Sequence, residues 1–278
     1  MDAARPRRLA IVAGDGPLPN KLVSACRAQG IDTFVVGLEG QASPEWSRAN
    51  AQRVLRLGQG GRLLRLMKEQ GADAIVFVGK VHRPSLRAIR PDWTTAQILM
   101  RLAFQGRLGD DAITGAVVKR FERDGFRVMA VQELLGTVDA VGPLGRRRPT
   151  PEEARDIELG VEAARTVGRL DIGHAVVVQG GAVLAVEAAE GTDALIRRAS
   201  ALQRGGPGAV LVKMAKPQQD ARADPPTLGL ATVECAAAGG FGGIAFETER
   251  SLVVDLPAMT KAADAANMFL VGLAPDGG

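Results

Sequence analysis

The stretch Leu9-Ala-Ile-Val-Ala-Gly-Asp-Gly16 decides the fold, because a short apolar run ends in glycines and leads into a helical pattern. Five apolar residues in a row predict a strand that is buried on both faces. Similar apolar runs, separated by helical patterns, occur at residues 33–37, 74–78 and 126–131. Short buried strands alternating with helices are typical of a parallel sheet covered by helices. We therefore predict an α/β fold that begins with a Rossmann-like, doubly wound domain over residues 1–140.

A second domain is expected after a stretch rich in glycine, proline and arginine. Residues 141–149 have the composition of a linker. Thr150 then predicts a helix start, since Pro151 suits the first turn and Glu153 completes a capping box. Gly180-Gly181 lies between two apolar runs and predicts a tight hairpin turn. More strands and helices follow, so residues 150–278 are predicted to form a mixed α/β domain.

The composition limits the classes of function. Tyrosine is absent, aromatic residues make up 4% of the chain, and the net charge is +4. Stacking platforms and the basic surface that nucleic acids require are therefore not expected, whereas a small anionic substrate fits. Cys26 and Cys235 are isolated in the sequence, which fits a reducing compartment. No apolar run reaches the roughly 18 residues of a spanning helix. We expect a cytoplasmic protein with peripheral membrane contact at most.

Candidate binding residues of the first domain lie just after its predicted strands, where parallel sheets bind ligands. The turn Gly14-Asp15-Gly16 would let a phosphate approach backbone N–H groups and the amino end of a helix. Lys80 and Arg83 bring cationic groups together that suit phosphate oxygens. A plain tight turn and a solvated basic turn remain as alternatives. A dinucleotide site is disfavoured, because Pro19 replaces the third glycine of its fingerprint.

Carboxylates begin two of the predicted helices. Asp110 and Asp111 suit either a helix cap or a role at a metal or a ribose. Thr192 and Asp193 follow the hairpin closely, together with Glu187. They suit either the cap of the next helix or a set of oxygens presented to Mg²⁺. The sequence pattern leaves both interpretations open.

The segment from Lys213 to Pro226 carries the clearest functional signal. Two lysines end a predicted strand, and a proline-bounded loop follows with amides, aspartates and an arginine. Phosphate chemistry needs cations at the non-bridging oxygens, a hard metal held by carboxylates, and a positioned water. This segment can supply all three kinds of group. Its candidate residues are Lys213, Lys216, Gln219, Asp220, Arg222 and Asp224.

In these segments the sequence resembles the LpxI family, the UDP-2,3-diacylglucosamine pyrophosphatases of lipid A biosynthesis. The resemblance spans nearly the whole chain and rests on several motifs in a fixed order, none of which is specific alone. These motifs are Ile11–Pro19, Gly79–Leu86, Gly109–Ala112, Glu190–Ala194 and Lys216–Asp224. Ala223 departs from the bulkier apolar residue expected there. The resemblance implies two domains joined by a linker, with the lipid nucleotide bound in the cleft between them.

The resemblance also implies a reaction. UDP-2,3-diacylglucosamine is hydrolysed to UMP and 2,3-diacylglucosamine 1-phosphate (lipid X), by Mg²⁺-assisted attack of water on the β-phosphorus. Asp224 is implied as the principal catalytic residue, and with Asp220 it would hold Mg²⁺ or Mn²⁺ or position the water. Lys213 and Lys216 would stabilise charge on the pyrophosphate, while Gly14–Gly16 would cradle part of the UDP. Hard ions are expected because the chain lacks the histidine and cysteine ligands that zinc prefers.

The expected partners follow from the same resemblance. A substrate drawn from the inner leaflet places the enzyme at the inner face of the cytoplasmic membrane as a peripheral protein. A homodimer is expected from the family and from how common dimers are.

Two other functions remain open on the sequence. A non-catalytic nucleotide sensor could use the same cleft, although crowded carboxylates do not help an anion binder that has no metal. A nicotinamide-dependent oxidoreductase would need the glycine turn to work without its third glycine.

Overall fold

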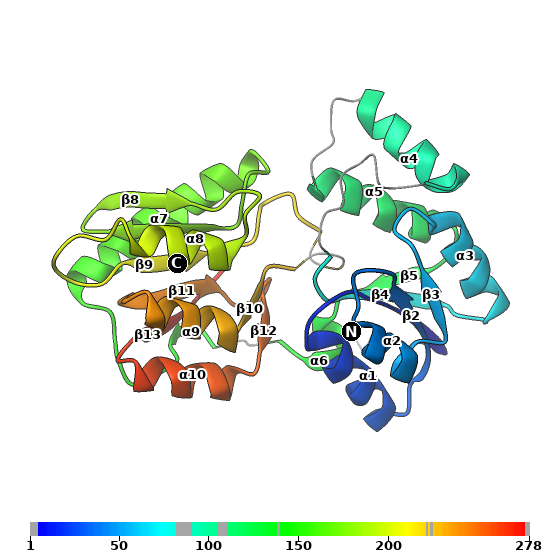
Figure 1. Cartoon of the computed structure of the whole chain (residues 1–278), viewed down its shortest axis with the longest axis horizontal. Helices are drawn as coiled ribbons and strands as arrows, with labels where there is room; N and C mark the ends of the chain where they lie inside the picture. The colour runs from blue at the N-terminus through cyan, green and yellow to red at the C-terminus, as the bar shows by residue number, and fades with distance from the viewer. Residues whose placement is uncertain are drawn as a thin grey trace. The chain divides into compact units, whose positions relative to one another are not determined.

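The computed structural model describes residues 5–81, 91–104, 110–137, 140–220, 222 and 225–275. The chain divides into two compact units (Figure 1). The first unit comprises Met1–Gly136 with Arg222–Asp224, and the second comprises Thr137–Ala221 with Pro225–Gly278. No helix in the described ranges combines the length and the apolar character that crossing a bilayer requires.

The first unit is built on a five-stranded parallel sheet with the order β3-β2-β1-β4-β5. Its strands are β1 (Arg8–Ala13), β2 (Asp32–Leu38), β3 (Arg53–Leu55), β4 (Ala74–Val78) and β5 (Arg127–Met129). Its helices are α1 (Leu18–Ala28), α2 (Pro44–Asn50), α3 (Gly60–Glu69), α4 (Trp93–Phe104), α5 (Asp110–Arg123) and α6 (Gln132–Leu135). The predicted parallel α/β architecture is confirmed. Strand β3 was not predicted, since its sequence Arg-Val-Leu starts with a charged residue and only Leu55 is buried.

The central position of β1 explains why its sequence is so apolar. It pairs in parallel with β2 on one side and with β4 on the other. Leu9, Ala10 and Ile11 are fully buried. A strand that is covered on both faces cannot alternate apolar and polar residues, which is why the run reads as continuous.

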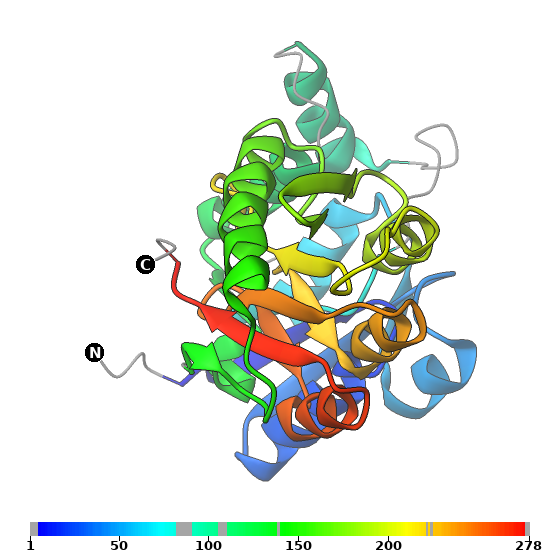
Figure 2. The same cartoon turned by 90° about the vertical axis from the view of Figure 1, so that its left-hand side faces the viewer.

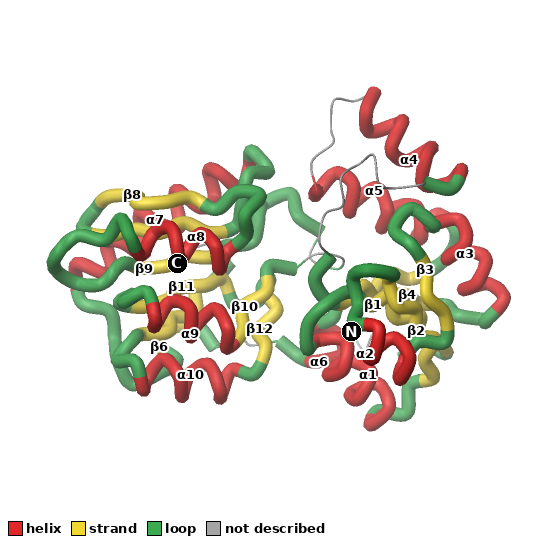
Figure 3. The backbone as a smooth tube through the Cα atoms, viewed as in Figure 1, coloured by secondary structure: helices red, strands yellow, loops and turns green. Residues whose placement is uncertain are grey.

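The second unit contains a six-stranded mixed sheet with the order β6-β13-β11-β9-β7-β8, and a small parallel pair β10-β12. Its strands are β6 (Gly142–Pro143), β7 (Ala175–Gln179), β8 (Ala182–Val186), β9 (Val210–Lys213), β10 (Thr227–Gly229), β11 (Gly243–Glu247), β12 (Leu252–Val254) and β13 (Phe269–Leu273). Its helices are α7 (Pro151–Arg169), α8 (Thr192–Ser200), α9 (Leu230–Ala238) and α10 (Leu256–Ala265). Strands β9, β11 and β13 run parallel, whereas β7 is antiparallel to both β8 and β9. The predicted mixed α/β character is confirmed (Figure 3).

Two local predictions in this unit are also confirmed. Thr150 Oγ1 accepts a hydrogen bond from Glu153 N at 3.2 Å, and Glu153 Oε2 accepts one from Thr150 N at 2.8 Å, which is the capping box. Gly180 and Gly181 both have positive φ, 58° and 75°, as a tight hairpin turn between β7 and β8 requires.

Residues 141–149, expected as a linker, pack within the second unit. β6 pairs with β13, and Arg146 N donates to Asp264 Oδ1 at 2.7 Å. Arg147 donates to Gly242 O and to Glu153 Oε1. Composition suggested a linker because glycine, proline and arginine avoid regular elements, yet here the arginines find acceptors on distant segments. By contacts, the boundary between the units lies at Gly136 and Thr137.

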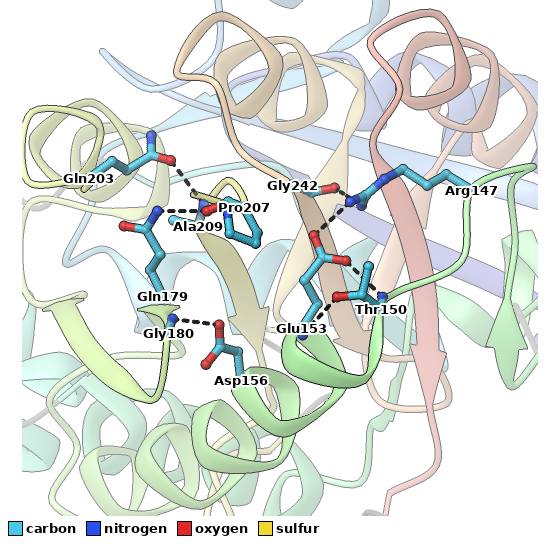
Figure 4. Close-up of polar contacts among 10 residues, drawn as sticks. All are labelled: Arg147, Thr150, Glu153, Asp156, Gln179, Gly180, Gln203, Pro207, Ala209 and Gly242. Carbon is cyan, nitrogen blue, oxygen red and sulfur yellow. Dashed lines mark hydrogen bonds and ion pairs between the residues drawn. The ribbon is translucent and has the colours of Figure 1, made fainter. Parts of the chain in front are cut away.

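A network of polar groups holds the amino ends of β9 and β11 (Figure 4). Glu153 is fully buried and pairs with Arg147 at 2.7 Å, which in turn binds Gly242 just before β11. Asp156 accepts hydrogen bonds from the two amides of the Gly180-Gly181 turn. These buried carboxylates have partners within the fold, so we assign this end of the sheet to stability. Figure 2 shows α7, which carries both acids, running along the sheet.

Candidate functional site

Polar side chains gather at the opposite end of the strands of the same sheet, where β8, β9 and β11 end and β7 begins. We call this end of the sheet its carboxyl-end edge. Lys213 ends β9 and lies in register with Ala175 of β7 on one side and with Phe246 of β11 on the other. His174 precedes β7, Glu187 follows β8, and Glu247 ends β11. The strand order therefore brings four titratable residues from separate parts of the sequence to one edge.

Lys213 is held at this edge by a chain of hydrogen bonds. Its side chain is buried, with the residue 6% exposed, and Nζ donates to Thr192 Oγ1 at 2.9 Å and to Thr227 O at 2.8 Å. The Thr192 hydroxyl donates to Glu187 Oε1 at 2.8 Å, while Glu187 Oε2 accepts from His174 N at 3.1 Å. A buried ammonium group is costly unless it is paired and hydrogen-bonded. The relay Glu187–Thr192–Lys213 meets that requirement and fixes the position of the charge.

Lys216 is the second buried cation of this edge, with 5% of the residue exposed. Its Nζ lies 2.5 Å from Asp171 Oδ1. The following turn is closed by Gln219, whose main-chain N donates to Lys216 O at 3.1 Å. Gln219 Oε1 accepts a hydrogen bond from Lys216 N at 3.4 Å. The lysine is therefore held at both its main chain and its side chain.

Glu247 supports the main chain between the two lysines. Its Oε2 accepts a hydrogen bond from Ala215 N at 2.9 Å. Burial raises the pKa of this carboxyl group, since the residue is only 1% exposed. Arg250 Nε lies 3.8 Å from Oε1, and its Nη2 donates to Lys216 O at 2.9 Å. Glu247 and Arg250 thus set the path of the chain after β9.

His174 lies among these charged groups, and its imidazole ring is neutral. Burial, together with the positive charges of Lys213 and Lys216, lowers its pKa to about 3, while the negative charge of Asp171 acts in the opposite direction. Its Nδ1 is buried and has no hydrogen-bond partner among the described residues. The imidazole is therefore neutral at physiological pH.

The low pKa of His174 predicts a pH-dependent stability. The pKa of His174 is about 3 in the folded state and 6.5 in the unfolded state. The unfolded protein therefore binds a proton at this residue more readily than the folded protein does. Its contribution to stability is present above pH 6.5 and is lost as the pH falls from 6.5 towards 3. We expect the free energy of unfolding to fall more in the wild type than in His174→Gln between about pH 7.5 and about pH 5. Urea unfolding at both pH values measures this, and His82 is common to both proteins. Equal losses would refute the shifted pKa.

Thr192 and Asp193, predicted together, have different surroundings. Thr192 joins the Lys213 relay, whereas Asp193 Oδ1 accepts a hydrogen bond from Thr232 Oγ1 on α9 at 3.3 Å. The main-chain oxygen of Asp193 also lies 3.7 Å from Cys235 Sγ. Asp193 therefore connects α8 to α9. Asp220 is partly buried in the loop that follows Lys216.

In the first unit, the loops after β1 and β4 are joined by their main chains. Asp15 N donates to Lys80 O, and Lys80 N donates to Asp15 O, each at 2.8 Å. Gly14 N donates to Val78 O, and Gly16 N donates to Asp15 Oδ1 at 2.7 Å. A Cβ atom at Gly14 would lie 2.3 Å from Lys80 O, so glycine is required for this approach. Because these amides donate within the protein, a phosphate at this loop would have to be held by other groups.

Several predicted residues fall at or beyond the limits of the described structure. Arg83 and Asp224 lie outside the described residues, as does the side chain of Asp110. Helix α5 begins at Asp110, and the carboxylate of Asp111 is favourable at the amino end of a helix. Arg222 belongs by contacts to the first unit, and its guanidinium pairs with Glu122 at 2.6 Å.

Sequence reasoning missed Asp171, His174 and Glu247. Asp171 has a positive φ of 56°, in the turn that connects α7 to β7. Two titratable residues between a helix and a buried strand are a signal that the sequence offers. Nothing local in the sequence, however, shows that Asp171 meets Lys216, which is 45 residues away.

Known proteins match this chain across both units. The LpxI N-terminal domain model matches residues 8–138, and the LpxI C-terminal domain model matches residues 140–271. The UDP-2,3-diacylglucosamine pyrophosphatase LpxI of Caulobacter vibrioides is 40% identical over 276 residues, which cover 97% of this chain and 98% of that protein.

Two solved structures are distantly similar to this chain. The biotin carboxylase domain of 2-oxoglutarate carboxylase from Hydrogenobacter thermophilus is 14% identical, with a TM-score of 0.25 over 72% of this chain and 41% of that one. The biotin carboxylase subunit of pyruvate carboxylase is 15% identical, with a TM-score of 0.24 over 66% of this chain and 38% of that one.

Proposed function

Because this chain belongs to the LpxI family, we propose that it hydrolyses the pyrophosphate bond of UDP-2,3-diacylglucosamine in lipid A biosynthesis, yielding UMP and 2,3-diacylglucosamine 1-phosphate. The observation that supports this chemistry best is the pair of buried lysines at the carboxyl-end edge of the second unit. Lys213 and Lys216 are each held by side-chain partners. Fixed cations of this kind suit a reaction that moves negative charge along a pyrophosphate.

The two lysines act on the phosphate oxygens in this proposal. Negative charge grows on the leaving phosphate as the bond to the β-phosphorus breaks, and water attacks that phosphorus. An ammonium group that is already held in place need not reorganise as the charge develops. The neutral ring of His174 adds no charge at this edge, so the electrostatic field there comes from the lysines and the carboxylates that orient them.

We propose Mg²⁺ or Mn²⁺ as the cofactor, held by Asp220 and Asp224. Both ligands would be carboxylate oxygens, which suit a hard cation better than zinc. Within the described ranges, no three histidine, cysteine, aspartate or glutamate residues are grouped to hold a metal, and Asp224 lies outside those ranges. The chemistry that such an ion supplies when bound is neutralisation of phosphate charge.

The remaining substrate contacts stay predictions. They comprise Gly14, Asp15, Gly16, Lys80, Arg83, Asp110, Asp111, Asp193, Gln219 and Arg222. Peripheral attachment to the inner face of the membrane and a homodimer also remain proposals. A non-catalytic sensor is not favoured, because the relative that matches along nearly the whole chain is named as an enzyme.

Hydrolysis in ¹⁸O-labelled water tests the proposed function directly. Purified protein is incubated with UDP-2,3-diacylglucosamine and Mg²⁺, and both products are analysed by mass spectrometry. We expect the label in the sugar phosphate, UMP without label, and loss of turnover in excess EDTA. Label in UMP would place the attack at the α-phosphorus. Full turnover in EDTA would exclude the metal, and no UMP with any divalent ion would refute the function itself.

The relay to Lys213 gives a second prediction. Thr192→Val removes the hydroxyl that links Glu187 to Lys213, so the ammonium group keeps Thr227 O but loses one acceptor and is held less firmly. We expect kcat to fall about 10- to 100-fold, the equivalent of ~1–3 kcal/mol, with little change in KM. Thr192→Ser should recover most of the activity, because it restores the hydroxyl.

The matched control for this variant is Thr166→Val on α7. The hydroxyl of Thr166 donates to Glu162 O within the same helix, and the residue is exposed. This variant should keep the wild-type kcat. An equal loss in Thr192→Ser and Thr192→Val would mean that the side chain serves packing and not the relay.

A further inference from the structure

Helix α4 exposes large apolar side chains on one face. Trp93 is 73% exposed, Met100 is 48% exposed and Phe104 is 92% exposed. The spacing of seven and eleven residues places all three within about 40° of arc around a helix. We call this set, Trp93, Met100 and Phe104, the α4 stripe. Exposed apolar side chains that cluster on one face mark a site of interaction more often than side chains scattered singly.

The orientation of α4 is fixed from its other side. Asp92 Oδ1 accepts a hydrogen bond from Thr95 N at 2.9 Å, and Oδ2 accepts one from Arg62 N at 3.1 Å. Thr95 Oγ1 accepts a further bond from Gly60 N at 3.1 Å. Leu102, on the face opposite the stripe, is buried. Helices α3 and α5 are the main neighbours of α4, as Figure 1 also shows. These contacts hold the buried face, so the stripe points away from α3 and α5.

The charges on and beside α4 indicate what covers the stripe. Among the twelve residues of α4 the single charged residue is Arg101, which is exposed, and the helix contains no carboxylate. The neighbouring helix α3 exposes Arg62 and Arg65, with Glu69 as the one acidic residue of its span. A helix surface with tryptophan, phenylalanine and methionine, bordered by Arg101 and without carboxylates in the helix, is complementary to the interface of an anionic bilayer. There the rings enter the headgroup region and the cations meet phosphate groups.

We propose that the α4 stripe, bordered by Arg101, docks this protein on an anionic lipid bilayer. This inference rests on the proposed function, because a diacylated sugar nucleotide is anchored in a membrane and its hydrolase has to meet it there. The helix is too short to span a bilayer and would lie in the plane of the interface. The stripe is thus the surface through which the enzyme reaches a membrane-held substrate.

Vesicle sedimentation tests the docking without any turnover. The probes are vesicles of phosphatidylcholine alone and of phosphatidylcholine mixed with phosphatidylglycerol. We expect the wild type to bind the anionic vesicles preferentially, and Trp93→Ser with Phe104→Ser to weaken that binding at least about tenfold. Arg101→Glu should reduce binding to the anionic vesicles alone. The matched control replaces Val54 and Leu202 with serine, since these side chains are 48% and 47% exposed elsewhere on the protein.

Tryptophan fluorescence reports on the stripe itself. The chain has two tryptophans, so Trp46→Phe leaves Trp93 as the sole emitter. We expect its emission to shift to shorter wavelength when anionic vesicles are added. An unchanged spectrum, or binding by the double serine variant that equals the wild type, would overturn the proposal. An equal loss of binding in the Val54 and Leu202 control would do the same.

Two further outcomes separate this proposal from related ideas. If the double serine variant turns a wild-type dimer into a monomer in gel filtration, the stripe binds a second copy of the chain and the bilayer proposal is wrong. Turnover of a short-chain, water-soluble substrate should be unaffected in that variant, while turnover of vesicle-held substrate falls. A wild type that docks through the stripe without hydrolysing either substrate would refute the proposed function and leave the docking surface standing.

Discussion

Lys213→Met is expected to lower kcat by about 10³-fold while the protein remains folded, because one fixed positive charge would disappear from the pyrophosphate site. Methionine is unbranched and fills the volume of the buried lysine stem. Glu187 keeps its hydrogen bonds from Thr192 and from His174 N, so the carboxylate is not left without partners. The loss should therefore appear in the rate of the chemical step more than in stability. Single-turnover kinetics, together with the melting temperature, measures both.

Two controls define what the Lys213 result means. Lys213→Arg keeps the charge with a different geometry and should retain part of the activity. Lys261→Met removes an exposed lysine of α10 in the same unit and should leave kcat unchanged. A Lys213→Met rate within tenfold of the wild type would show that this cation does not act on the reaction.

The second large effect is expected from Asp224→Ala. Its carboxylate is proposed to hold the metal or position the water, and both matter mostly as charge develops in the transition state. We expect kcat to fall about 10³-fold or more, equivalent to ~4 kcal/mol. Substrate affinity should persist or increase, since a negative charge beside the pyrophosphate is removed. Single-turnover rate and equilibrium binding of the substrate are to be measured on the same preparation.

The alternative role for Asp224 is to cap the turn before Pro225. In that case the variant should lose only about 1 kcal/mol of stability and remain active. Asp255 provides the matched control, because its Oδ1 accepts a hydrogen bond from Ala258 N at 3.2 Å and caps α10. Asp255→Ala should show the stability loss of a cap with unchanged kcat. If Asp224→Ala behaves in the same way, its catalytic role is wrong.

Local patterns in the sequence were sufficient for much of the fold. The apolar run Leu9–Ala13 predicted β1, because a strand buried on both faces has to be apolar throughout. Thr150 and Glu153 predicted the start of α7, since a capping box involves residues only three positions apart. Composition alone did not predict the contacts of residues 141–149, a stretch rich in arginine, glycine and proline. Residues 141–149 belong to the second unit because Arg147 reaches Gly242, 95 residues away.

The candidate site was predicted in part. Lys213, Lys216 and Thr192 were singled out from the sequence, and the structure brings Thr192 to Lys213. The sequence did not distinguish Thr192, whose hydroxyl joins the relay, from Asp193, whose carboxylate binds α9. Adjacent residues on a helix point in directions about 100° apart. Which of them faces the lysine depends on how α8 packs on the rest of the unit.

The sequence by itself indicated most of the strands and helices, and it placed lysines and carboxylates at and after the end of β9. It did so because strand burial, helix caps and tight turns are set by neighbouring residues. Only the tertiary structure decided that Asp171 pairs with Lys216 and that Glu187 orients Lys213 through Thr192. It also decided that His174 stays neutral, because the ring is buried near the two lysines. These contacts join segments far apart along the chain. They exist because the strand order places the start of β7 beside the end of β9, and no local pattern encodes that order.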